Sequence, residues 1–70
     1  MVYMGGIGKN LRKRAKELGL SDTEIARRIG IPQRRYSNYV NDQREPDFRM
    51  LKKICNVLGV SYDYLFSEKD

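Results

Sequence analysis

The stretch that decides the fold is "LSDTEIARRIGIPQRRYSNYV", residues 20–40, which reads as two short helices joined by a tight turn. Ser21 is a natural N-cap, and Glu24 three residues later predicts a capping box that satisfies two backbone N–H groups. Gly30 ends the first helix, and Pro32 favours the start of the second. Helix, sharp turn and helix in succession is the arrangement of a helix-turn-helix.

The second helix, expected over about residues 33–41, has two chemically different faces. Its inner face follows the i, i+3, i+4 spacing of a surface packed on a core: Tyr36, Tyr39 and Val40. The opposite arc, about 140° wide at roughly 100° per residue, carries Gln33, Arg34, Ser37, Asn38 and Asn41. Arg35 lies at the seam, beside Tyr39. Because amides, hydroxyls and guanidiniums pair with base edges in the major groove, this arc predicts a DNA-reading surface, although a hydrated face is the simpler alternative.

Helical periodicity continues on both sides of this motif. The preceding helix is predicted from apolar residues in steps of four, four and three: Ile7, Leu11, Ala15 and Leu18. A later helix, capped by Asp47, is predicted from the inner face Phe48, Leu51, Ile54, Cys55 and Leu58. Ser61 caps a final short turn. We therefore expect a compact all-α domain of five helices, at about residues 7–18, 22–29, 33–41, 47–58 and 62–66.

Seventy residues form one small domain, near the lower limit for a self-sufficient core. We expect residues 1–6 to be a flexible arm, residues 7–66 the domain and residues 67–70 a solvated tail. No apolar run approaches the roughly 20 residues of a membrane span, and no signal peptide opens the chain. A cytoplasmic protein, prokaryotic or phage-encoded, with no membrane partner is the expectation.

The charge is concentrated in one half of the chain. Residues 1–35 hold nine of the fourteen basic and three of the nine acidic residues, a net charge of +6, whereas residues 36–70 carry −1. A polyanion is the natural partner of such a surface, with nucleic acid ahead of an acidic membrane. The alternative is a basic face that is merely solvated.

The composition and motifs argue against a disulfide, a metal site and an enzyme active site. One cysteine and no histidine leave no internal disulfide and no usual zinc site, and Cys55 is expected to be a buried thiol. No Gly-rich phosphate loop follows a strand, and no carboxylates cluster. We therefore expect no enzyme, metal, cofactor or small-molecule ligand.

These residues resemble the DNA-binding domain of the phage lambda-repressor and Cro-like (XRE-type) helix-turn-helix family over about residues 7–66. The matching marks are Ala26 and Gly30 at small-residue positions, Ile25 and Ile29 packing inward, Tyr39, the "REPD" loop and the ending "LKKICNVLGVSYDYL". The resemblance implies that the helix beginning near Pro32 lies in the major groove. It also implies roles for individual residues.

By this resemblance, Gln33, Arg34 and Asn38 stand where the family reads bases, with Ser37 adjacent. Asn41 and Arg44 stand where it grips the phosphate backbone, and Thr23 approaches phosphate through the helix N-terminus. Further candidate phosphate contacts are Lys9, Arg12, Lys13, Arg27, Arg28 and Arg35.

Two positions depart from the family pattern. Asp22 stands where many members carry Gln, and its carboxylate would repel phosphate unless Arg34 or Arg35 pairs with it. Tyr36 replaces the commoner aliphatic residue; it either fills the core with its ring and places its hydroxyl at the surface, or tilts the helix.

The predicted function is therefore a sequence-specific double-stranded DNA-binding transcriptional regulator, a repressor. One short helix discriminates few base pairs, so a homodimer on a palindromic operator, with half-sites about 34–36 Å apart, is expected. Tyr62, Tyr64 and Phe66 form a candidate dimer patch, although Tyr64, Leu65 or Phe66 could instead cap the core. The alternative function is a protein-interaction module, such as the antitoxin of a toxin–antitoxin pair.

Overall fold

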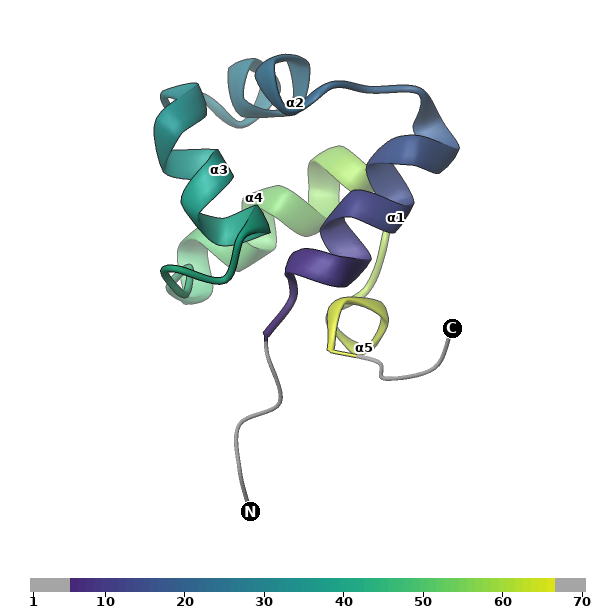
Figure 1. Ribbon diagram of the computed structural model, residues 1–70. Coiled ribbons are helices and arrows are strands. Elements are labelled where there is room, and N and C mark those ends of the chain that lie inside the picture. The colour runs from purple at the N-terminus through teal and green to yellow at the C-terminus, as the bar shows by residue number, and fades with distance from the viewer. Residues whose placement is uncertain (1–5, 67–70) are drawn as a thin grey trace.

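The computed structural model describes residues 6–66, which contain five α-helices and no strand (Figure 1). The helices are α1 (Gly8–Leu18), α2 (Asp22–Ile29), α3 (Gln33–Val40), α4 (Phe48–Leu58) and α5 (Tyr62–Leu65). This confirms the all-α prediction. Four predicted ranges were one residue too long, and the extra residue is in each case a cap: Ile7, Asn41, Asp47 and Phe66. The predicted tail and residues 1–5 of the predicted arm lie outside the described residues.

The helices begin where the sequence supplies capping side chains. The Ser21 hydroxyl accepts a hydrogen bond from the Glu24 N–H at 3.1 Å, and the Asp47 carboxylate accepts one from the Met50 N–H at 2.8 Å. Ser61 caps α5 in the same way. Such caps satisfy N–H groups that have no partner inside the helix.

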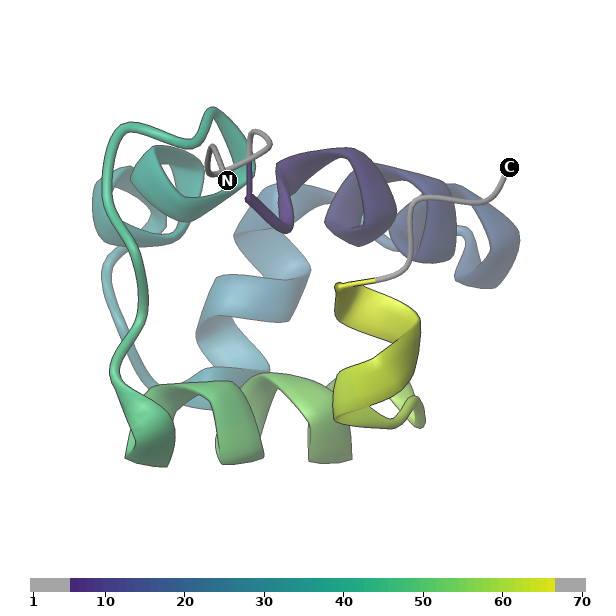
Figure 2. The same ribbon diagram turned by 90° about the horizontal axis from the view of Figure 1, so that it is seen from below.

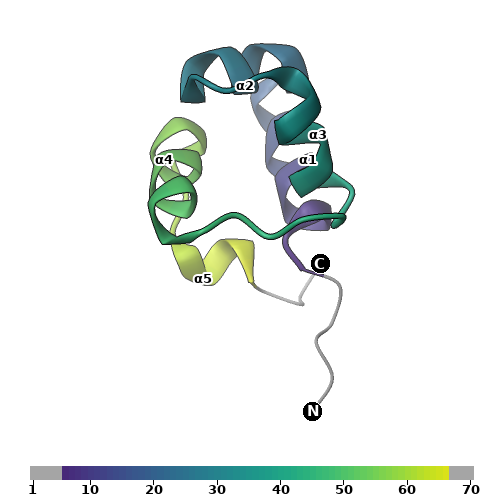
Figure 3. The ribbon, with the colours of Figure 1, turned by 90° about the vertical axis from the view of Figure 1, so that its left-hand side faces the viewer.

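The helices enclose a single apolar core. In Figure 3, α1 and α3 form one side and α4 the opposite side, while α2 and α5 close the two ends. Figure 2 shows the same separation of α4 from α1 and α3. The largest side chains less than 2% exposed are Tyr36, Tyr39, Leu11, Ile25, Ile54, Leu58 and Leu65. The core is therefore drawn from every helix, including the four-residue α5.

Two residues of the predicted inner faces are exposed. Leu18 is 39% exposed, and Phe48 is 68% exposed, because the core face of α4 is centred on Met50 and Ile54 rather than on its first residue. Phe48 instead lies against Tyr62, with the ring centroids 5.8 Å apart. Cys55 is buried as predicted, and burial raises the pKa of its thiol.

Two side chains of α1 form hydrogen bonds with the C-terminal part of the fold. The amide of Asn10, which is only 4% exposed, donates to the Leu65 carbonyl at 2.8 Å. The Arg14 Nε donates to the Leu58 carbonyl at 2.8 Å and so satisfies the end of α4. Within residues 6–66, no helix is both long and apolar enough to cross a membrane.

Candidate nucleic-acid interface

The turn between α2 and α3 is held by two hydrogen bonds to the same carbonyl oxygen. The N–H groups of Gly30 and Ile31 both donate to the Ala26 carbonyl oxygen, at 2.8 and 3.0 Å. Gly30 has φ of 95°, a left-handed conformation that residues with side chains rarely adopt. Pro32, the N-cap residue with an extended ψ of 148°, then immediately precedes α3. α3 consequently packs directly against α2 (Figure 1).

α3 divides into a buried face and an exposed face, as the helical wheel predicts. Its buried side chains are at most 3% exposed: Tyr36, Tyr39 and Val40. The predicted base-reading residues lie on the other face: Gln33 and Arg34 are exposed, and Ser37 and Asn38 are half-buried. The fold therefore brings these four residues together as one strip of amide, hydroxyl and guanidinium groups. Such groups can match donors and acceptors on base edges.

Arg35 lies at the edge of this strip. Its Nε donates to the Tyr39 hydroxyl at 3.1 Å, one turn further along α3. This bond satisfies the hydroxyl of an almost fully buried tyrosine and fixes the direction of the guanidinium. The remaining N–H groups of Arg35 can still reach a phosphate, because a guanidinium has five donors.

The start of α2 presents mixed charge. Thr23 is exposed and Asp22 is half-buried. Within residues 6–66, Asp22 forms no ion pair, so neither Arg34 nor Arg35 neutralises its carboxylate. The condition under which Asp22 could face a phosphate is not met, and Thr23 remains the candidate contact on this turn.

The predicted capping box is only half formed. Ser21 caps the Glu24 N–H as predicted, but the Glu24 carboxylate turns away from Ser21 and accepts hydrogen bonds from Arg27 and Arg28. Hydrogen bonds from these two arginines, with Arg27 contributing most, lower the pKa of Glu24 to about 2. The sequence misleads here because two arginines, at i+3 and i+4, compete for the same carboxylate. Arg27 and Arg28 are thus paired with an acid rather than unengaged.

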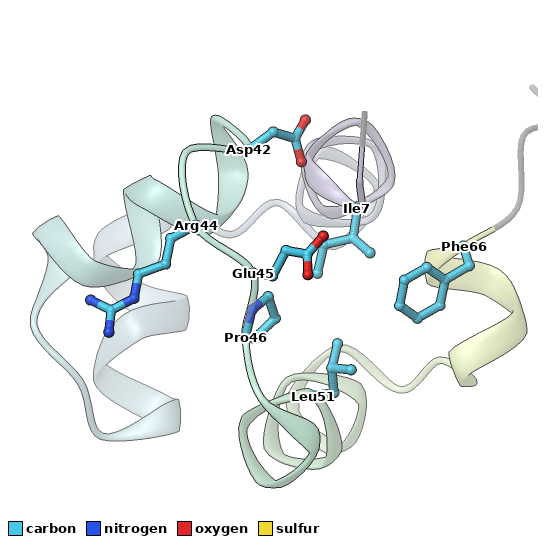
Figure 4. Close-up of a pocket in the computed structure, with 7 residues that line it drawn as sticks. All are labelled: Ile7, Asp42, Arg44, Glu45, Pro46, Leu51 and Phe66. Carbon is cyan, nitrogen blue, oxygen red and sulfur yellow. The ribbon is translucent and has the colours of Figure 1, made fainter. Parts of the chain in front are cut away.

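The C-terminal end of α3 is attached to α1. The Arg12 guanidinium donates to the Asn41 side-chain oxygen, and the Gly8 N–H donates to the Asp42 carboxylate at 3.0 Å. Arg12 and Asn41 are both exposed. Arg44 follows in the exposed loop before α4 and points away from Ile7 (Figure 4). The predicted phosphate contacts Asn41 and Arg44 are thus accessible.

Tyr36 fills the core with its ring but does not place its hydroxyl at the surface. The residue is 0% exposed, and no other group within residues 6–66 forms a hydrogen bond with the hydroxyl. Burial, with a smaller contribution from the Asp22 charge, raises the pKa of Tyr36. The first alternative for this residue is therefore wrong about the hydroxyl, because the inner face of α3 is covered completely.

Tyr36→Phe is expected to raise the free energy of unfolding by about 1–3 kcal/mol, since a buried hydroxyl without a partner carries its full desolvation cost. Urea unfolding at neutral pH measures the change. Tyr39→Phe is the matched control: it deletes a hydroxyl that is bonded to Arg35 and is expected to leave stability unchanged or lower. Equal stabilisation by both substitutions would contradict the assignment.

The raised pKa of Tyr36 adds a pH dependence. Above the ordinary tyrosine pKa of about 10, the unfolded chain loses this proton while the folded chain retains it, so stability falls as the pH rises. The stability gap between Tyr36→Phe and the parent chain should therefore be constant at neutral pH and widen above about pH 10.

Sequence reasoning missed the connection between α1 and the end of α3. Arg12 and Asn41 are 29 residues apart, and no local pattern signals that they meet. Gly8 carried a weak signal, because a glycine inside a helical period often marks a close approach. In the part of the chain described, no group of three His, Cys, Asp or Glu side chains is placed to hold a metal ion.

Comparison with known proteins agrees with this geometry. A helix-turn-helix family model matches residues 11–65. The chain is 34% identical over 64 residues to the HTH-type transcriptional regulator ImmR of Bacillus subtilis, covering 91% of this chain and 50% of ImmR. It is 40% identical over 57 residues to the B. subtilis HTH-type regulator YqaE, covering 81% of this chain and 49% of YqaE. The chain thus spans about half the length of these relatives.

A solved structure gives the same fold. The crystal structure of the clp gene regulator ClgR from C. glutamicum superposes with a TM-score of 0.76, covering 90% of this chain and 91% of that one, at 21% sequence identity. At this identity the likeness concerns the fold alone. The family assignment comes from the sequence match over residues 11–65, together with the tight turn and two-faced α3. The chain belongs to the lambda-repressor and Cro-like helix-turn-helix family.

Proposed function

We propose that this chain is a sequence-specific double-stranded DNA-binding transcriptional regulator that reads the major groove with α3. The observation that carries the proposal is the strip Gln33, Arg34, Ser37 and Asn38 on the outer face of α3, backed by a fully buried inner face. Because its inner face is packed, α3 can present these side chains without rearranging. Direct readout requires such a pre-positioned set of donors and acceptors.

Four further residues are proposed as phosphate contacts: Thr23, Arg35, Asn41 and Arg44. They flank the base-reading strip, at the start of α2, along the edge of α3 and beyond its C-terminal end. Contacts on both sides of a reading helix fix its register on the duplex. The exposed basic face of α1 adds general attraction to a polyanion.

The named relatives support regulation of transcription. ImmR and YqaE are named as HTH-type transcriptional regulators. We propose that this chain acts as a repressor in a prokaryotic cytoplasm, by occupying an operator. The chain spans about half the length of those relatives, so no effector is proposed from the regions it lacks.

Selection from a pool of random duplexes tests the proposal. The recovered duplex and a scrambled one are then titrated from about 50 to 200 mM salt, over which phosphate contacts lose affinity steeply. A recovered motif that keeps its advantage over the scrambled duplex at every salt concentration supports the proposal. Equal affinity for both duplexes, or no binding, contradicts it.

We further propose that the regulator binds a palindrome as a homodimer through an exposed aromatic patch, Phe48, Tyr62 and Phe66. These three residues are 68%, 37% and 53% exposed, respectively. Tyr64, also a candidate for the patch, is half-buried with its hydroxyl inside, so Phe48 from α4 takes its place.

The patch continues into a pocket of about 340 Å³ next to α5. Its apolar lining includes Ile7, Pro46, Leu51 and Phe66, and Figure 4 shows the Phe66 ring facing into it. Exposed aromatic area beside an apolar depression is typical of a protein interface.

The variant Tyr62→Asp is expected to sediment as a monomer and to bind a palindrome about 10-fold or more weakly, while a half-site is bound as before. Lys53→Asp, on an exposed position of α4 outside the patch, is the control and should remain dimeric. A dimer that survives Tyr62→Asp and Phe66→Asp alike would contradict the proposed patch.

The same patch also favours the alternative function, a protein-interaction module such as an antitoxin, because an apolar face can serve a different partner. The selection experiment separates the two functions. An interaction module without DNA readout would recover no motif, although its basic α1 could still bind any duplex at low salt.

A further inference from the structure

The contact between Arg12 and Asn41 joins α1 to the C-terminal cap of α3 and has no role in the reading strip. The Arg12 guanidinium donates to the Asn41 side-chain oxygen, 29 residues along the chain. Both residues are exposed, so the contact lies at the surface beside the end of α3.

Its contribution to folding is small. The two helices are already fixed to each other by the Gly8 N–H, which donates to the Asp42 carboxylate at 3.0 Å, and by the close approach of Gly8 to the Val40 carbonyl. Exposed polar contacts between long side chains add little stability, because water competes for both partners. The geometry of α1 and α3 therefore does not require the Arg12–Asn41 contact.

The contact does arrange hydrogen-bond donors. Asn41 uses its oxygen to accept from Arg12, so its side-chain NH₂ group keeps two donors, and Arg12 retains further N–H groups. Because the two side chains touch, these donors lie next to each other on one exposed surface. An oxygen-rich anion such as a phosphodiester is the chemical group that accepts from several adjacent cationic and amide donors.

We propose that Arg12 and Asn41 form a phosphate clamp, a pair of side chains from two helices that grips one backbone phosphate beyond the C-terminal end of α3. This inference rests on the proposed DNA-binding function and adds α1 to the contact surface. By holding Arg12 in place, Asn41 lowers the entropy that a mobile guanidinium would lose on binding. The clamp then sets how far α3 can turn in the groove.

The test compares the duplex affinity of Arg12→Ala with that of Lys13→Ala and Lys16→Ala. All three residues are exposed on α1, and within residues 6–66 neither lysine forms a hydrogen bond or ion pair with α3. Arg12→Ala is expected to weaken binding about 10-fold on any duplex and to reduce the slope of log affinity against log salt by about 1, more than either control. An effect equal to that of the lysine variants would overturn the clamp and leave Arg12 a solvated charge.

Asn41→Asp distinguishes a clamp from a merely structural contact. An aspartate at this position can still accept from Arg12, so the thermal midpoint of unfolding should be unchanged or higher. Its carboxylate would repel phosphate, and affinity should fall about 10-fold or more. Unchanged affinity in Asn41→Asp would overturn the proposal.

A double-mutant cycle completes the test. The combined variant Arg12→Ala/Asn41→Ala should lose less affinity than the sum of the two single losses, because each side chain positions the other. Fully additive losses would show two independent side chains and overturn the clamp.

The result can be separated from failure of the proposed function. If the parent chain prefers its selected duplex while Arg12→Ala behaves like the controls, only the clamp fails. If the parent chain binds duplexes without preference, the clamp can still be measured, because phosphate contacts do not depend on sequence. If the parent chain binds no duplex, both proposals fail.

Discussion

Replacing Gly8 with alanine is expected to lower the free energy of unfolding by about 2–4 kcal/mol, as overpacking against rigid backbone does. An ideal Cβ on Gly8 would lie 2.0 Å from the Val40 carbonyl oxygen and 2.8 Å from the Val40 carbonyl carbon. These are main-chain atoms at the end of α3, and they cannot move aside as the tip of a side chain could. The methyl group must therefore push α1 and α3 apart.

This result would run against helix propensity. Gly8 is the first residue of α1, and alanine in a helix is ordinarily favoured over glycine by up to about 1 kcal/mol. Propensity and packing thus predict opposite signs for one substitution. Urea or thermal unfolding decides between them, and a chain that no longer folds counts as the packing result. A more stable Gly8→Ala variant would show that α1 and α3 do not approach as closely as described.

Gly19→Ala provides the matched control. Gly19 has φ of 71°, and a Cβ there would meet no atom within 4 Å. Gly19→Ala should lower the free energy of unfolding by about 1–2 kcal/mol, and only because alanine is strained in a left-handed backbone conformation. A larger loss at Gly8, despite its ordinary helical backbone, would isolate the effect of crowding. The folded fraction of Gly8→Ala should also bind DNA more weakly, because the displaced main chain carries Asn41.

The elements of this fold were predictable because their signals are local. Ser21, Asp47 and Ser61 mark helix starts through their own side chains, and each forms the expected cap. The inner face of α3 followed from a spacing of three and four residues, and Tyr36 and Tyr39 are buried accordingly. Signals that act within one helical turn can be read from the sequence.

The predictions that were wrong involve groups that compete for one partner or that meet only in the tertiary structure. Phe48 fits the helical period of α4, yet it lies beyond the edge of the core, and only the position of α5 shows that its ring rests on Tyr62. The Glu24 carboxylate could accept either from the Ser21 backbone N–H or from nearby arginines, and in the structure it accepts from Arg27 and Arg28. Both outcomes depend on relative energies or tertiary placement, which spacing alone does not contain.

The candidate site divides in the same way. The reading strip was predictable because Gln33 and Asn38 share one helix, so their common face follows from helical geometry. The neighbours at its end were not, because Arg12 reaches Asn41 only after α1 and α3 pack. The sequence shows which residue types a helix face carries. Which residues from other helices border that face depends on how the whole chain packs.

Arg34→Ala is expected to weaken binding to the selected duplex by about 1–3 kcal/mol, roughly 5- to 150-fold, and to relax preference at one base position. Arg34 is exposed in the first turn of α3, and within residues 6–66 its guanidinium has no hydrogen bond or ion pair to break. It can therefore offer two parallel donors to a guanine. Affinities for the selected duplex and its single-base variants measure both effects.

Arg34→Lys separates charge from geometry. Lysine keeps the positive charge but lacks the two-pronged fork, so preference at that base should fall nearly as far as in Arg34→Ala while the salt slope stays unchanged. Arg44→Ala should behave in the opposite way, weakening every duplex alike and lowering the slope by about 1. Equal losses on all duplexes for Arg34→Ala would make Arg34 a phosphate contact. α3 would then owe its specificity to the amides of Gln33 and Asn38, whose geometry favours adenine over guanine.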